Sequence, residues 1–196
     1  MYSRVGILAV ILAAVPASTL QVARAQQNST AIAPTTSSEA KPFLTVEKPM
    51  LGFKISYPSD WNITDNDFVI SFKASNNAAN VTLSIMNLSS YSKANLTLEQ
   101  YSVNEIDTIK SVESKRVGNF FELIESKPYL LSGQLGHEIV FLNGTGADAT
   151  HDYTKTLLVW SIVDGKVYQI RYSAKVSEYS NYIQTVFYMI DSFRLL

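Results

Sequence analysis

The sequence contains no cysteine. Disulfide bonds, thiolate metal sites and a lipid-anchoring cysteine are therefore excluded, and the folded protein depends on burial of apolar side chains for its stability. Charged residues are also sparse, at 17% of the chain, with 16 basic residues against 17 acidic ones. Because the bases are scattered singly among the acids, the chain lacks the clustered positive field of a nucleic-acid-binding protein.

Histidine is nearly as scarce, because the chain has only His137 and His151. It also lacks a P-loop, a dinucleotide fingerprint, a zinc-protease helix motif and a Gly-x-Ser-x-Gly nucleophile motif. We therefore assign no catalytic or cofactor-binding residue and expect no enzyme activity. His137 is next to Glu138 at the start of a predicted strand, where neighbouring side chains point to opposite faces. We interpret His137 as structural.

A long apolar run is present only near the first residue. Arg4 precedes the uncharged stretch 5–15, and Ala23-Arg24-Ala25 provides the small residues that signal peptidase requires. We predict a signal peptide over residues 1–25, cleaved after Ala25, and hence a secreted or extracytoplasmic protein. A retained membrane anchor is the alternative, although the run is shorter than the roughly 20 residues that span a bilayer. After cleavage the protein is not expected to be transmembrane.

Residues 26–42 are rich in Ser, Thr, Ala and Pro, and they have too few apolar side chains to form a core. We predict a disordered spacer there and a single folded domain over residues 43–196. Removal of Arg4 and Arg24 with the signal leaves 14 basic residues against 17 acidic ones. The chain also carries Asn-x-Ser/Thr sequons, which predict a glycosylated surface, at Asn28, Asn62, Asn80, Asn87, Asn95 and Asn143.

Apolar and polar residues alternate with the period of a half-buried strand at 53–57, 68–72 and 81–85. Pro58 ends the first of these strands, and a turn at Ser59-Asp60 returns Trp61 to the sheet. Further strands are predicted at 120–125, 136–142, 154–163 and 166–174. These segments predict an antiparallel sheet of about six strands.

Asp164-Gly165 is typical of a two-residue type I′ hairpin, because both turn positions need a positive φ. This turn pairs Val163 with Lys166 and Leu157 with Tyr172, so that one face of the hairpin is strongly apolar. The other face is mixed, with Trp160 among its apolar residues. Both faces of the sheet therefore need cover.

Two predicted helices can provide this cover. Thr97-Leu98-Glu99-Gln100 has the form of a capping box, and an apolar stripe follows it at Leu98, Tyr101, Ile106, Ile109 and Val112. A second helix is predicted over 177–190, with its apolar side at Tyr179, Ile183, Val186, Phe187 and Ile190. The predicted fold class is therefore α+β, an antiparallel sheet with helices on both faces.

Two stretches resemble PsbP-like proteins: Leu51-Gly-Phe-Lys-Ile-Ser-Tyr-Pro-Ser-Asp-Trp61 near the domain start, and a long last helix that runs into Ile190-Asp-Ser-Phe193. The resemblance covers residues 44–196 and implies a PsbP-like α/β/α sandwich. It also implies an exported, non-catalytic accessory or binding domain with a protein partner in the cell envelope, similar to the extrinsic PsbP subunit of photosystem II. Nothing in these residues indicates photosynthesis, and no metal-linked residue of that subunit can be placed on this sequence.

Two other functions stay open. The loop 143–152 places Asp148, His151 and Asp152 close together, and these residues could bind calcium or manganese, although no cofactor is expected. An exported hydrolase or metal-dependent enzyme would use this loop. A carbohydrate or polymer binder would instead need exposed aromatic side chains, for which the candidates are Trp160, Tyr91 and Tyr129.

Overall fold

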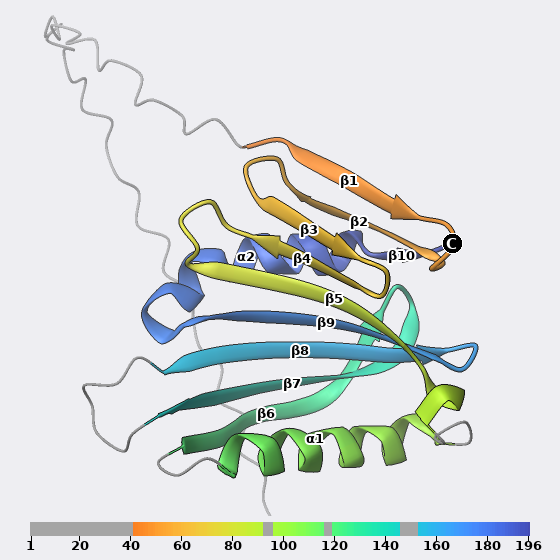
Figure 1. Cartoon of the computed structure of the whole chain (residues 1–196), viewed down its shortest axis with the longest axis vertical. Helices are drawn as coiled ribbons and strands as arrows, with labels where there is room; N and C mark the ends of the chain where they lie inside the picture. Colours follow the sequence, from red (N-terminus) through yellow and green to blue (C-terminus); the bar gives the residue numbers. More distant parts are fainter. Residues whose placement is uncertain (1–40, 92–95, 116–118, 146–152) are drawn as a thin grey trace, which may run out of the picture. The chain divides into compact units, whose positions relative to one another are not determined.

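The computed structural model describes residues 41–91, 96–115, 119–145 and 153–196. The predicted signal peptide and nearly all of the predicted spacer lie outside these ranges, so both stay predictions. The elements follow one another along the chain (Figure 1) as β1 (Phe43–Lys48), β2 (Phe53–Pro58), β3 (Asn62–Asn66), β4 (Val69–Lys73), β5 (Ala79–Asn87), a 3-10 turn (Leu88–Tyr91), α1 (Leu98–Ser114), β6 (Asn119–Leu131), β7 (Gln134–Thr145), β8 (Thr154–Val163), β9 (Lys166–Lys175), α2 (Val176–Ser192) and β10 (Arg194–Leu195).

The strands form two antiparallel sheets. The large sheet has seven strands in the order β3-β4-β5-β9-β8-β7-β6, and the small one has three in the order β1-β2-β10. The predicted α+β class is confirmed, but the large sheet has seven strands where about six were expected, and a second sheet is added. The strands missed from sequence are β1, β10 and β3. All five residues of β3 are exposed, so it has no buried face to produce an apolar period.

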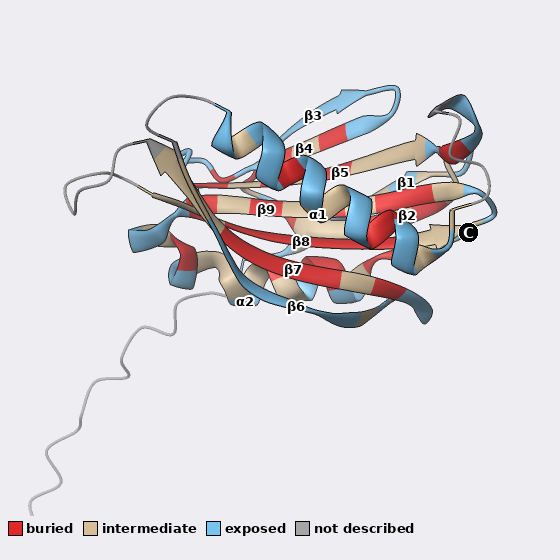
Figure 2. Ribbon diagram, turned by 90° about the horizontal axis from the view of Figure 1, so that it is seen from below, coloured by how far each residue is buried: buried red, intermediate tan, exposed pale blue. Residues whose placement is uncertain are grey.

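The helices α1 and α2 lie on opposite sides of the large sheet (Figure 2). One core, which we call the α2-side core, joins α2 to the sheet and to the inner face of β2, with Phe53, Ile55, Leu157, Val159, Ile170, Tyr172, Val186 and Ile190 among its members. The other, the α1-side core, joins α1 to the opposite face through Tyr101, Ile109, Ile139, Phe141, Leu158, Trp160 and Val167. Both faces of the sheet are therefore apolar where a helix covers them.

The hairpin of β8 and β9 has the predicted turn and register. Asp164 and Gly165 have φ angles of 50° and 72°, and Val163 pairs with Lys166 while Leu157 pairs with Tyr172. A second tight hairpin, which the sequence analysis did not identify, joins β6 to β7 through Ser132 (φ 53°) and Gly133 (φ 78°). Because of this turn, β6 continues to Leu131, six residues past its predicted end.

The predicted apolar stripe of the first helix is correct at one end and wrong at the other. Tyr101 and Ile109 are buried, but Val112 is 57% exposed, and Ser102 is buried in a position where no apolar residue was expected. At the end of the helix the half-buried Glu113 faces the sheet and bonds to Asn143 on β7, whereas the neighbouring Val112 does not. The second helix buries Tyr179, Val186 and Ile190, as predicted, together with Met189.

Candidate functional site

The helix α1 begins with the capping box that the sequence predicts. Gln100 N donates to Thr97 Oγ1 at 3.2 Å, and Thr97 N donates to the side-chain oxygen of Gln100 at 3.0 Å. These two bonds satisfy backbone N–H groups that have no partner inside the helix. The first turn of α1 is therefore well defined, and it forms one wall of the site described below.

Two polar contacts anchor the N-terminal half of α1 over the middle of the sheet. Trp160 Nε1 on β8 donates to Ser102 Oγ at 3.0 Å, and Gln169 Nε2 on β9 donates to the hydroxyl of Tyr101 at 3.1 Å. Burial raises the pKa of the Tyr101 hydroxyl, with the nearby carboxylate of Glu105 acting in the same direction. Tyr101 therefore stays protonated and keeps its place in this network.

The other end of α1 lies over a different part of the sheet. Glu113, near the end of the helix, accepts a hydrogen bond of 3.0 Å from Asn143 Nδ2 on β7. The helix thus runs from above β8 and β9 at its start to above β7 at its end. Because of this diagonal course, a wedge opens between the first half of α1 and the hairpin of β6 and β7.

The wedge is a groove of about 550 Å³ with mostly apolar walls. Its lining residues are Thr97, Leu98, Glu99, Ser102, Val103 and Ile106 from α1, and Ser126, Pro128, Leu135, Gly136 and His137 from the hairpin. Val103 and Leu135 are 55% and 63% exposed although both are apolar. A volume of this size and an apolar lining with a few polar groups are typical of ligand-binding sites.

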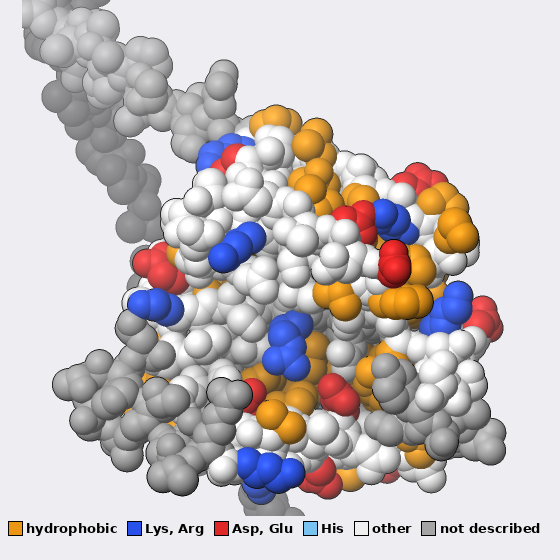
Figure 3. All heavy atoms as spheres, in the orientation of Figure 1, with side chains coloured by type: hydrophobic (Ala, Val, Ile, Leu, Met, Phe, Trp, Pro, Cys, Tyr) orange, Lys and Arg blue, Asp and Glu red, His pale blue; other side chains and the backbone are white. Residues whose placement is uncertain are grey.

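The lining of the groove includes one carboxylate, Glu99, and neither lysine nor arginine. On the side of the molecule that α1 covers, hydrophobic side chains form several separate groups with acids and bases between them (Figure 3). On this side the described residues thus present intermixed acids and bases, without a broad field of one sign. The groove is therefore suited to an uncharged apolar group.

The polar centre of the groove is a contact that sequence analysis did not find. Ser126 Oγ on β6 and His137 Nε2 on β7 are 2.8 Å apart. The imidazole ring lies over the indole of Trp160, with 5.2 Å between the ring centroids. Burial lowers the pKa of His137, only partly opposed by the charge of Glu138, so the imidazole is neutral at pH 7. Ser126 and His137 therefore form a hydrogen bond between two uncharged side chains.

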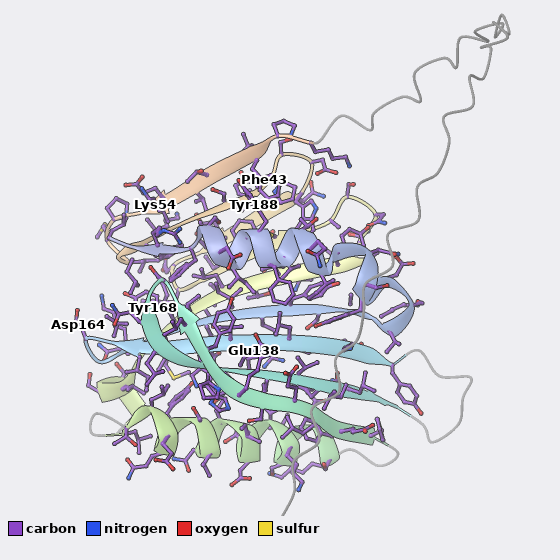
Figure 4. The ribbon with its side chains drawn as sticks, turned by 180° about the vertical axis from the view of Figure 1, so that it is seen from behind. Phe43, Lys54, Glu138, Asp164, Tyr168 and Tyr188 are labelled. Atoms are coloured by element: carbon purple, nitrogen blue, oxygen red, sulfur yellow. The ribbon has the colours of Figure 1, made fainter. Side chains whose placement is uncertain are left out.

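A serine beside a histidine is the start of a nucleophilic site, but a hydrolase also needs a group that orients the histidine. Among the described residues, no carboxylate hydrogen-bonds to the other ring nitrogen of His137. The adjacent Glu138 belongs to the opposite face, which α2 covers (Figure 4), where it is 3% exposed and lies 3.0 Å from Lys127 Nζ. Ser126 and His137 are thus hydrogen-bonded to each other, but among the described residues no carboxylate orients the imidazole.

The predicted metal residues Asp148, His151 and Asp152 lie outside the described residues, and the metal hypothesis stays a prediction. The start of their loop was wrong, because 143–145 belong to β7. Within the described ranges, no three acidic, histidine or cysteine side chains come together in a way that could hold a metal ion. In the same part of the chain, no helix is long and apolar enough to span a membrane.

The sequons differ in accessibility. Asn62 and Asn87 are exposed, and Asn87 Oδ1 accepts bonds from the backbone N–H and the hydroxyl of Ser89. Asn80 and Asn143 are half-buried, and each uses its amide nitrogen as a donor within the fold, to Thr82 and Glu113 respectively. Asn28 and Asn95 lie outside the described residues.

Two of the three aromatic residues considered for carbohydrate binding are at least half-buried. Trp160 is fully buried under α1, and Tyr129 is half-buried. The side chain of Tyr91 lies outside the described part of the structure. The burial of Trp160 therefore removes the largest of the three candidates for stacking against a sugar.

No family model matches this chain, and no curated protein matches it in sequence. Solved structures do match. Cyanobacterial PsbP (CyanoP) from Synechocystis sp. PCC 6803 superposes with a TM-score of 0.62 at 13% identity, over 84% of this chain and 99% of that protein. The Ran-binding protein Mog1p of Saccharomyces cerevisiae superposes with a TM-score of 0.52 at 10% identity, over 80% of this chain and 96% of that protein. The predicted PsbP-like fold is confirmed. At such low identity the likeness shows the fold alone.

Proposed function

We propose that this chain, with its PsbP-like fold, is an exported, non-catalytic binding domain that engages a protein partner in the cell envelope. The observation that supports it most directly is the groove beside α1, where Val103 and Leu135 remain exposed in an apolar wall. Exposed apolar side chains that gather in one concavity mark interaction sites. A fold neighbour that is itself a Ran-binding protein gives this use of the fold a precedent.

The partner can be tested by placing a photo-crosslinking residue at position 103 in the organism that makes the protein. We expect one discrete protein to be cross-linked there, because Val103 lines the groove. Position 112 is the matched control, since Val112 is on the same helix and is 57% exposed against 55% for Val103, but lies outside the groove. The same product from both positions, or none from position 103 at native protein level, would contradict the proposal.

Export is part of the proposal, and the intact mass of the purified native protein tests it. We expect loss of residues 1–25 and added glycan mass at Asn62 and Asn87, whose side chains are exposed. The half-buried Asn80 and Asn143 serve as internal controls, because their amide nitrogens already donate hydrogen bonds and should carry no glycan. A mass that includes the first 25 residues would instead indicate a membrane anchor.

The hydrolase alternative has one specific observation in its favour, the 2.8 Å contact between Ser126 and His137. A fluorophosphonate reagent distinguishes the two functions, because it labels only an activated serine. For a binding domain, we expect the mass to stay unchanged after treatment. Labelling of Ser126 that disappears in Ser126→Ala would establish the hydrolase.

A further inference from the structure

We propose that the partner segment bound by the groove is an amphipathic α-helix that lies beside α1 and covers the remaining apolar part of the β6–β7 hairpin. This inference rests on the proposed binding function and adds what kind of element binds. It follows from three properties of the described residues: the width of the uncovered surface, the interrupted hydrogen-bonding pattern along the open edge of β6, and the charge of the groove lining.

A single helix is too narrow to cover this face of the sheet. An α-helix with its side chains is about 10 Å across, whereas neighbouring strands are about 4.8 Å apart, so one helix covers roughly two strands. The described sheet has seven strands, and α1 crosses it diagonally. The apolar surface left uncovered lies beside the first half of α1, and its most exposed members are Val103 and Leu135.

The neighbouring edge strand cannot bind a partner by simple strand addition. Leu131 and Gln134 flank the two-residue turn and form a hydrogen-bonded pair, so Pro128 and His137, three positions further along, form a non-hydrogen-bonded pair. The nitrogen of Pro128 therefore points to the open edge, where it has no hydrogen to donate. A bulge between Leu123 and Glu125 interrupts the same edge. These features exclude a regular added strand.

The groove lining favours a helix face without acidic groups. Its polar pair, Ser126 and His137, is internally hydrogen-bonded, and its one charged residue is Glu99. A partner in the groove thus comes close to one carboxylate, that of Glu99, which a basic flank would pair with and an acidic partner would oppose with a second carboxylate. An apolar helix face flanked by lysine or arginine is complementary to this arrangement.

The length of the groove sets the length of the bound element. Its lining on α1 runs from Thr97 to Ile106, which corresponds to about 15 Å of helix. A partner helix of roughly three turns matches this distance and places apolar side chains at positions i, i+3 or i+4, and i+7 in the groove. Leu135 and Val103 are then on either side of it.

The test uses synthetic probes and the full exported protein. Three peptides of about 14 residues are compared by fluorescence anisotropy: leucine and lysine arranged with helical period, the same composition in strict alternation, and leucine and glutamate with helical period. We expect the helical leucine–lysine peptide to bind at least about tenfold more tightly than either of the others. Equal binding of the alternating peptide would overturn the proposal.

Two variants of equal charge control for non-specific attraction of lysine. Val103→Asp should weaken binding of the helical peptide by about tenfold or more, whereas Val112→Asp should leave it within about twofold. Equal effects of the two variants would refute a helix in the groove. If cross-linking at position 103 captures a partner but the helical peptide does not bind, the binding function stands and the helical occupant is wrong. If both experiments fail, both proposals fall.

Discussion

Trp160→Ala is expected to lower the free energy of unfolding by about 4 kcal/mol, because it removes the largest buried side chain from the centre of the α1-side core. The indole is fully buried, contacts the rings of His137 and Tyr101, and donates to Ser102. Its loss leaves a cavity under the first half of α1. Urea unfolding followed by far-UV circular dichroism measures the effect.

Trp160→Phe separates packing from hydrogen bonding. It keeps an aromatic ring in the core but leaves Ser102, which is 4% exposed, without its donor. We expect a loss of about 1–2 kcal/mol, smaller than for alanine. A Trp160→Ala protein within about 1 kcal/mol of the parent would contradict the described role of this residue. The peptide site should also be lost in the alanine variant, because α1 forms one of its walls.

Gly136→Ala is expected to cost about 3 kcal/mol, through a different mechanism. A Cβ atom at this position would lie 2.1 Å from the carbonyl oxygen of Trp160 on the neighbouring strand, so the backbones of β7 and β8 would have to separate. Because this contact involves backbone atoms, rotation of a side chain cannot relieve it. The same urea experiment measures the loss.

Gly133→Ala is the matched control, since it adds the same methyl group three residues away. Gly133 lies in the β6–β7 turn with φ of 78°, and nothing stands within 4 Å of the added atom. We expect only the conformational cost of a left-handed alanine, about 1 kcal/mol. Equal losses for the two variants would show that the contact of Gly136 with Trp160 is not the cause.

Much of the sheet could be predicted because its signals are local. The hairpin of β8 and β9 was found with its register, since Asp164-Gly165 specifies both the turn and the pairing. The start of α1 was found for a similar reason, because Thr97 and Gln100 are three residues apart and bond to each other. Elements without such signals, such as the exposed β3, were missed.

The groove could not be predicted in the same way. Ser126 and His137 meet only because β6 continues past residue 125 and turns back at Ser132 and Gly133. Neither feature was identified from sequence, so no nucleophile or hydrogen-bond partner could be assigned to His137. The exposure of Val112 has a related cause, because its neighbour Glu113 makes the contact with the distant strand β7.

The sequence by itself determined the antiparallel sheet with helices on both faces, the capped helix and the central hairpin, since apolar period and turn chemistry operate over a few residues. The tertiary structure alone decided where the apolar surface stays open. That opening depends on the angle at which α1 crosses the sheet, which is set by the contacts of Ser102 with Trp160 and of Glu113 with Asn143. These residues are 30 or more positions apart, and no local pattern connects them.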